Sequence, residues 1–187
     1  SEVDYALLQG HFPQNDEKLL ERIVSTAPTA KLLELLGQDY VPEDPSYAQS
    51  IVNSLGQGLL SRDDYSVDEL QRLLAANKPE VVELVARLMG RMDKVSKALV
   101  SSLEQALETY FTRWQTAYQR LEQKPDDYER QTTEKALAKT LEQLLWTLVQ
   151  QHLQPARLLQ LLTTKNKAEC AFQVHILTAL LAVDTVN

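Results

Sequence analysis

The sequence predicts an all-α protein, a helical bundle of six to eight helices built on a long antiparallel helix pair. The 187 residues include only five glycines and three phenylalanines. Long runs consist instead of Leu, Ala, Glu, Gln, Lys and Arg, the residues that lose least side-chain freedom in a helix. No stretch alternates polar and apolar residues over the length of a strand, so we expect essentially no sheet.

The first part of the chain carries start and stop signals for short helices. Asn15 is a suitable N-cap, Gly37 suits the residue after a helix, and Pro45 follows an aspartate at a helix start. Ser66 and Glu69 have the spacing of a capping box, in which each side chain satisfies a free backbone amide of the first turn. These signals predict helices over 16–25, 26–37, 45–60 and 66–77.

The second part is predicted to contain the long helices. Between residues 79 and 123 only Gly90 and the pair Ser101 and Ser102 interrupt the helix-forming residues, so the pattern favours one continuous helix. Such a helix would be about 65 Å long, whereas a compact chain of this length is roughly 40 Å across. The helix must therefore break at one of those two places, or project and need cover from another surface. Further helices are predicted over 128–153, 155–162 and 168–183, after a turn at 124–127.

Residues 106–121 hold four of the chain's aromatic side chains. At about 100° per residue they continue an apolar stripe that begins upstream, while the arginines of the same stretch point away. We interpret the aromatics as core; a partner-binding groove, a dimer seam and a stacking platform for a ligand are the alternatives. The four residues are Tyr110, Phe111, Trp114 and Tyr118.

Two apolar surfaces are candidate partner-binding sites. Trp146 falls on the side of its helix opposite the main leucine stripe, near Val149 and Leu153, where it either packs under the last helices or anchors a partner. The other surface is the end of the long helix away from the aromatics, which is expected to meet the acidic half or a second chain. Its candidate residues are Val81, Val85, Leu88 and Met92.

Polar residues with a chemical role are few. His175 lies in an apolar helix with small residues on its side, so it is either a core histidine or a contact in a ligand pocket. The three histidines lack the spacing of a metal site, and no nucleophile with a partner base is recognisable. With a single cysteine, Cys170, no internal disulfide can form. We therefore predict no catalytic residue, no metal site and no cofactor.

Composition and charge limit the classes of partner. Residues 1–78 carry 13 acidic and 6 basic side chains, which accounts for the whole net charge of −7. No cluster of Lys and Arg marks a nucleic-acid-binding face, and no apolar run is long enough to span a membrane. We expect a cytoplasmic protein with a single domain over 1–187, formed by an acidic short-helix part, 1–78, and a long-helix bundle part, 79–187.

These observations predict a non-catalytic protein-interaction module, such as an adaptor, a chaperone or a regulatory subunit, rather than an enzyme. It would present apolar helix faces to a protein partner or to further copies of itself. One alternative is a small-molecule-responsive regulator or helical enzyme with a pocket near His175. Another is a self-assembling structural module.

Overall fold

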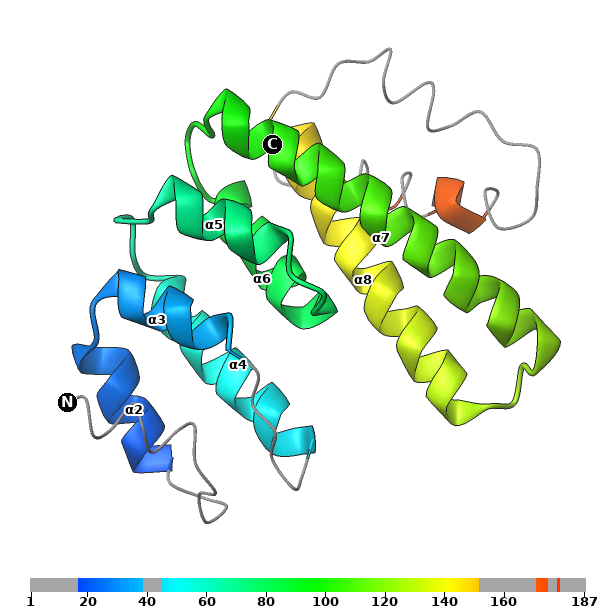
Figure 1. Cartoon of the computed structure of the whole chain (residues 1–187), viewed down its shortest axis with the longest axis horizontal. Coiled ribbons are helices and arrows are strands. Elements are labelled where there is room, and N and C mark those ends of the chain that lie inside the picture. Colours follow the sequence, from blue (N-terminus) through cyan, green and yellow to red (C-terminus); the bar gives the residue numbers. More distant parts are fainter. Residues whose placement is uncertain (1–16, 39–44, 152–170, 175–177, 179–187) are drawn as a thin grey trace. The chain divides into compact units, whose positions relative to one another are not determined.

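The described part of the chain is all-helical, as predicted. The computed structural model describes residues 17–38, 45–151, 171–174 and 178, and these residues form helices and no strand. Contacts divide the chain into two compact units, residues 1–76 and 77–187 (Figure 1). This boundary lies close to the predicted change from short to long helices at residue 79. That 1–187 forms a single domain stays a prediction.

The first unit is built from short helices that pack on one another. Helix α4 packs against α2 and α3, and α5 packs against α3. Gly58 allows the approach of α4 to α2, because a Cβ atom there would lie 2.4 Å from Cγ1 of Val24. A glycine that weakens helix propensity is therefore used for close packing. The helices are α2 Glu17–Thr26, α3 Thr29–Leu36, α4 Pro45–Leu59 and α5 Val67–Leu74.

The loop after α4 fastens the corner between α2 and α3. The Arg62 guanidinium donates from Nη1 to the Ala27 carbonyl at 2.7 Å and from Nη2 to the Val24 carbonyl at 2.9 Å. These carbonyls belong to the end of α2, where backbone acceptors lack helical partners and a positive charge is favourable. Next along the chain, Ser66 accepts from the Glu69 amide, so the Ser66 half of the predicted capping box is confirmed, whereas Glu69 Oε2 is buried without a hydrogen-bond partner.

In the second unit, three helices replace the two long ones that were predicted. The continuous helix over 79–123 was wrong: the chain breaks after Gly90, the first of the two expected positions, whereas Ser101 and Ser102 lie inside α7. Helix α8 packs against both α6 and α7 (Figure 1). The three helices are α6 Pro79–Gly90, α7 Lys97–Gln123 and α8 Tyr128–Gln150.

Local and distant contacts fix the break between α6 and α7. Ser96 caps α7 by accepting from the Leu99 amide at 3.3 Å. From the end of α8, the Gln151 side-chain amide donates to the Met92 carbonyl and accepts from the Val95 amide, both at 3.2 Å. The Gln151 side chain thus gives hydrogen-bond partners to one backbone N–H and one backbone C=O of the loop, as a neighbouring backbone segment would.

Helices α7 and α8 form the predicted antiparallel pair. Trp114 in α7 donates from Nε1 to Glu134 Oε1 in α8 at 2.7 Å, and Arg130 donates from Nη1 to the Arg120 carbonyl at 2.6 Å. Later positions on α7 therefore face earlier positions on α8. The turn at 124–127 ends at Asp127, whose carboxylate caps α8 by accepting from the Arg130 amide.

Two of the four aromatic side chains of α7, Tyr110 and Trp114, are buried in the core as predicted, and Phe111 and Tyr118 are partly buried. Trp114 is fully buried, and its ring centroid lies 5.3 Å from that of Tyr118. Phe172, which belongs to a short helical stretch at 171–174, places its ring 4.1 Å from Phe111 and 6.0 Å from Trp114. Such tilted aromatic pairs add to the stabilisation from burial alone. Residues 171–174 thus cover the aromatic face of α7.

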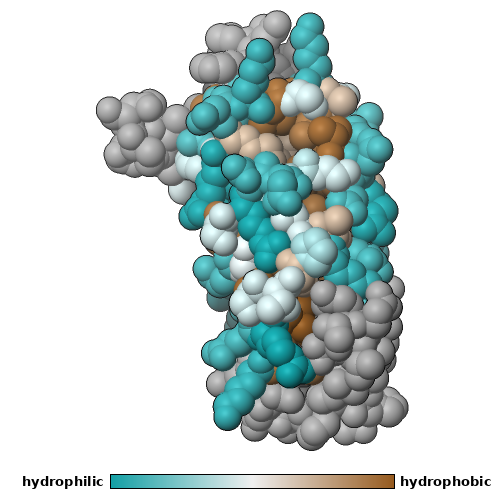
Figure 2. Space-filling view, turned by 90° about the vertical axis from the view of Figure 1, so that its left-hand side faces the viewer, coloured by the Kyte–Doolittle hydropathy of each residue, from teal (hydrophilic) through white to brown (hydrophobic). Residues whose placement is uncertain are grey.

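The surface of the molecule is largely hydrophilic on the face drawn in Figure 2, where hydrophobic residues show only between polar ones. Three large hydrophobic side chains are exposed among the described residues: Val67, Tyr128 and Val174. They lie on different elements and do not form a stripe along one helix.

The Trp114→Ala substitution is expected to destabilise the protein by about 3–5 kcal/mol, because it removes a large fully buried ring and leaves a cavity. It also leaves the Glu134 carboxylate without its indole donor. Chemical denaturation measures the difference, with Trp114→Phe as the control that keeps an aromatic ring. A Trp114→Ala protein with the wild-type unfolding midpoint would show that the ring is not core.

Alkaline pH is expected to weaken the fold through Tyr110. Burial raises the pKa of this side chain above 10.0; the charge and hydrogen bond of Arg113 lower it in part, and Glu80 adds to the rise. The unfolded tyrosine ionises near pH 10 while the folded one stays neutral, so stability falls as the pH rises above about 10. In Tyr110→Phe the free energy of unfolding should fall less steeply with pH over that range. Equal slopes in the two proteins would contradict the assignment.

Candidate functional site

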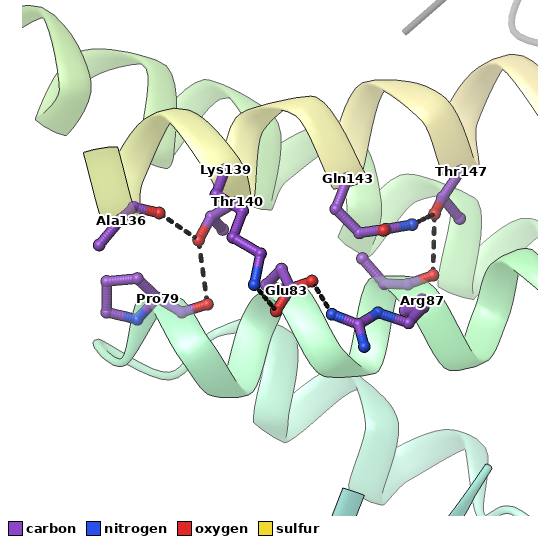
Figure 3. A network of polar contacts seen from close by, with 9 residues as sticks. Pro79, Glu83, Arg87, Ala136, Lys139, Thr140, Gln143 and Thr147 are labelled. Carbon is purple, nitrogen blue, oxygen red and sulfur yellow. Dashed lines mark hydrogen bonds and ion pairs between the residues drawn. The ribbon is translucent and has the colours of Figure 1, made fainter. Parts of the chain in front are cut away.

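Two buried threonines join α8 to α6. The Thr140 hydroxyl lies 3.0 Å from the Pro79 carbonyl oxygen and 3.0 Å from that of Ala136, and Thr147 donates to the Ala86 carbonyl at 2.8 Å (Figure 3). The threonines are seven residues apart on α8, and so are the acceptors Pro79 and Ala86 on α6. The two helices therefore run parallel, with a fixed register.

A buried carboxylate lies between these two hydroxyl contacts. The Glu83 side chain of α6 is only 10% exposed, and it forms ion pairs with Arg87, one turn along α6, and with Lys139 of α8 (Figure 3). The Lys139 Nζ atom lies 3.6 Å from Glu83 Oε2. Burying a carboxylate is costly unless cations accompany it, and here both helices supply one. The α6–α8 contact is thus polar in part and satisfied.

Trp146 of α8 packs against the end of α6. A Cβ atom on Gly90 would lie 2.5 Å from Cζ3 of the Trp146 ring, 3.2 Å from Gln150 Oε1 and 3.3 Å from Thr147 Oγ1. Gly90 therefore supplies the space that the indole ring occupies. Trp146 is only partly buried, so part of this residue stays accessible. The sequence predicted that Trp146 either packs under the last helices or anchors a partner. Its partial burial is compatible with both placements.

A groove of about 530 Å³ opens beside this ring. Trp146 supplies its aromatic floor, and the other lining side chains from α6 and α8 are polar or charged. Thr178, from the last part of the chain, also lines the groove. The residues are Glu83, Arg87, Arg91, Lys139, Glu142, Gln143, Trp146 and Thr178.

The structure separates the residues that the sequence placed in partner-binding surfaces. Val81, Val85 and Leu88 are buried in this structure, and their contact with a partner stays a prediction. Val149 and Met92 are partly buried. Leu153 and His175 lie outside the described residues, so the predicted His175 pocket stays a prediction.

Charged residues of the groove are what the sequence analysis missed. Glu83 and Arg87 are four residues apart on a helix predicted to be an apolar stripe, a spacing that indicates an ion pair and was visible in the sequence. Lys139 and Gln143 lie more than 50 residues further on. Only the parallel packing of α6 on α8 brings them to the same groove.

A second cleft lies between α7 and α8, close to the turn that joins them. It has a volume of about 760 Å³ and is lined by three arginines, Arg113, Arg120 and Arg130, among other polar side chains. Arg113 and Arg120 are seven residues apart on the polar side of α7. Their common face could have been identified from the sequence; the position of Arg130 depends on the turn.

The described residues hold neither a cluster of metal ligands nor a helix suited to crossing a membrane. Within the ranges that the structure describes, no three His, Cys, Asp or Glu side chains come close enough to hold a metal ion. No helix in that part of the chain has both the length and the apolar character needed to cross a bilayer. Comparison with known proteins gives no matching family model, no similar curated protein and no similar solved structure.

The Gly90→Ala substitution tests the contact between Trp146 and α6. Alanine ordinarily stabilises a helix relative to glycine by about 0.5–1 kcal/mol. Here the added methyl group meets the indole ring, so the sign should reverse and the protein should lose about 1–3 kcal/mol through overpacking. Thermal or chemical denaturation measures the change.

A double-mutant cycle supplies the control. In a Trp146→Ala background the ring is absent, so Gly90→Ala should cost much less than it does in the wild type. If Gly90→Ala is equally destabilising in both backgrounds, the indole ring is not what requires glycine at this position.

Proposed function

We propose that the protein is a non-catalytic helical interaction module, and that the Trp146 groove is where it binds a segment of a partner protein. The observation that carries the proposal is the partly buried Trp146 at the floor of a groove whose rim is polar. Protein interfaces have this composition: an apolar or aromatic centre, often Trp, surrounded by polar residues that exclude water.

Charge favours one kind of partner. The groove is lined by three basic side chains, Arg87, Arg91 and Lys139, and by two acidic ones, Glu83 and Glu142. Three positive against two negative side chains leave a net charge of +1, so the rim favours acidic over basic residues on the partner. The proposed partner segment has an apolar side chain that contacts Trp146 and an acidic residue beside it.

The contacts of the groove support a binding role over a catalytic one. Its carboxylate Glu83 is held in ion pairs, and the hydroxyl of Thr178 already donates to the Val174 carbonyl. Neither is activated in the manner of a general base or a nucleophile. An adaptor, a chaperone or a regulatory subunit would use such a surface.

A variant pair tests the proposal. Trp146→Gln should lose a stoichiometric protein partner that the wild type captures from cell extract, because the aromatic floor is removed. Tyr128→Gln is the matched control: Tyr128 is 81% exposed on the same helix, so its loss reduces exposed aromatic surface without touching the groove. The control should keep the partner. Mass and stoichiometry of the purified complex are measured by sedimentation.

Folding has to be checked beside binding, because Trp146 also packs on Gly90. Lys139→Gln removes a side chain that is 68% exposed and is one of the two cations beside Glu83; it should weaken the same complex by several-fold, and its unfolding midpoint is measured beside that of Trp146→Gln. Capture of the same partner by all variants would contradict the proposal. So would a wild-type protein that self-associates through Trp146 without any partner, which would instead support the self-assembling module.

A further inference from the structure

We propose that the cleft between α7 and α8 binds a small organic oxyanion, a phosphate ester or a carboxylate, through Arg113 and Arg120. This site is separate from the Trp146 groove, and the inference does not rest on the proposed function. Its volume of about 760 Å³ lies within the usual range for small-molecule sites.

Arg113 supplies the first observation. Its guanidinium carbon lies 4.6 Å from the centroid of the Tyr110 ring, in a cation–π contact that fixes the group beside the cleft. Its Nη1 atom is buried and has no hydrogen-bond partner. A charged donor without an acceptor is unfavourable, and an oxyanion in the cleft would supply the acceptor once the guanidinium turns toward it.

Arg120 supplies the second observation. It lies seven residues after Arg113, hence on the same side of α7, and it lines the same cleft. Its side chain is exposed, and no ion pair is formed by it among the residues that the structure describes. Two guanidinium groups on one helix face can thus converge on a single oxyanion.

The other polar groups of the cleft decide what kind of ligand fits. Arg130 is already engaged: its Nε lies 3.3 Å from Asp127 Oδ2, and its Nη1 donates to a backbone carbonyl. Thr112, Thr116 and Thr133 donate their hydroxyl hydrogens to backbone carbonyls in the preceding turn. The hydroxyls can therefore only accept, so the anion depends on the arginines for its donors.

One acidic group opposes the anion. Glu129 lines the cleft and forms no ion pair with any side chain in the described ranges, whereas the charge of Asp127 is offset by Arg130. With Arg113 and Arg120 against Glu129, the groups that remain available leave the cleft positive. Removal of the Glu129 charge should therefore strengthen anion binding, an effect that a purely structural role of the arginines would not produce.

The site is tested by nuclear magnetic resonance titration of the full chain with inorganic phosphate and, separately, with succinate, at constant ionic strength to hold charge screening fixed. We expect saturable shifts centred on Arg113 and Arg120. A response to phosphate alone identifies a phosphate-bearing ligand, and a response to succinate alone identifies a carboxylate.

Four single substitutions test whether the anion binds at Arg113 and Arg120, by the change in its Kd relative to the wild type. Arg120→Gln should raise the Kd for the responding anion about ten-fold or more, since a charged hydrogen bond is lost, and Glu129→Gln should lower it. Arg113→Gln should act like Arg120→Gln; because Arg113 also packs on Tyr110, the exposed Arg120 decides the matter if the Arg113 variant unfolds. Lys97→Gln removes the same charge at the far end of α7 and should leave the Kd unchanged.

Three results would overturn the inference: no saturable shift with either anion, equal weakening by Arg120→Gln and Lys97→Gln, or weaker binding in Glu129→Gln. The second would indicate a response to net charge alone. Binding of a polyglutamate peptide but of neither small anion would also overturn it, in favour of a macromolecular surface.

Discussion

The parallel packing of α6 on α8 is the contact on which the second unit depends. Thr140 and Thr147 are 1% and 0% exposed, and each hydroxyl is satisfied by a carbonyl of α6. A buried hydroxyl without a partner costs about 1–3 kcal/mol, so sliding α6 along α8 would lose both contacts together. The register so fixed also places Glu83 beside Lys139 and Gly90 beside Trp146. The same constraint explains why the long helix breaks, because α6 can pack beside α8 only if the chain turns back after Gly90.

Helix α8 links this packing to both candidate sites. One side of it contributes Trp146 to the groove with α6, and its first turns contribute Arg130 and Thr133 to the cleft with α7. The two sites differ in chemistry: the groove is lined by one aromatic ring among polar side chains, which suits a protein segment, whereas the cleft has two guanidinium groups, Arg113 and Arg120, that form no ion pair with a described residue. A helix that packs on two neighbours can hold both sites rigid, since its register is fixed by the threonines and by the Trp114–Glu134 hydrogen bond.

Signals from residues close in sequence predicted most helix ends. The features that the sequence did not predict depend on contacts between residues far apart in the chain. The Ser66 cap, the Gly37 end of α3 and the turn before Tyr128 depend on neighbours within a few residues, and all were predicted. The aromatic core was also predictable, because the periodicity of one helix shows which side chains share a face. Gly90 was one of the two break positions that the sequence offered, but the choice between a break and a continuous helix depends on distant groups, the Trp146 ring and the Gln151 amide, 56 residues or more further along the chain. Ser96 is a local signal for the start of α7 that the prediction of one continuous helix did not use. The groove charges and the arginine cleft each combine residues of two helices, so only the packing brings them together.

A distance between spin labels at Glu80 and Glu108 tests the broken helix most directly. Pro79 of α6 contacts Thr140 of α8, and Trp114 of α7 contacts Glu134 of α8, so the register places the start of α6 level with the middle of α7. Labels are attached to cysteines at the two positions, with Cys170 replaced by serine. In one continuous helix the 28 intervening steps would separate the two backbones by about 42 Å. With α6 and α7 both packed on α8, the labels should be roughly 15–30 Å apart. A distribution centred near 42 Å would contradict the parallel packing of α6 on α8, and with it the Trp146 groove.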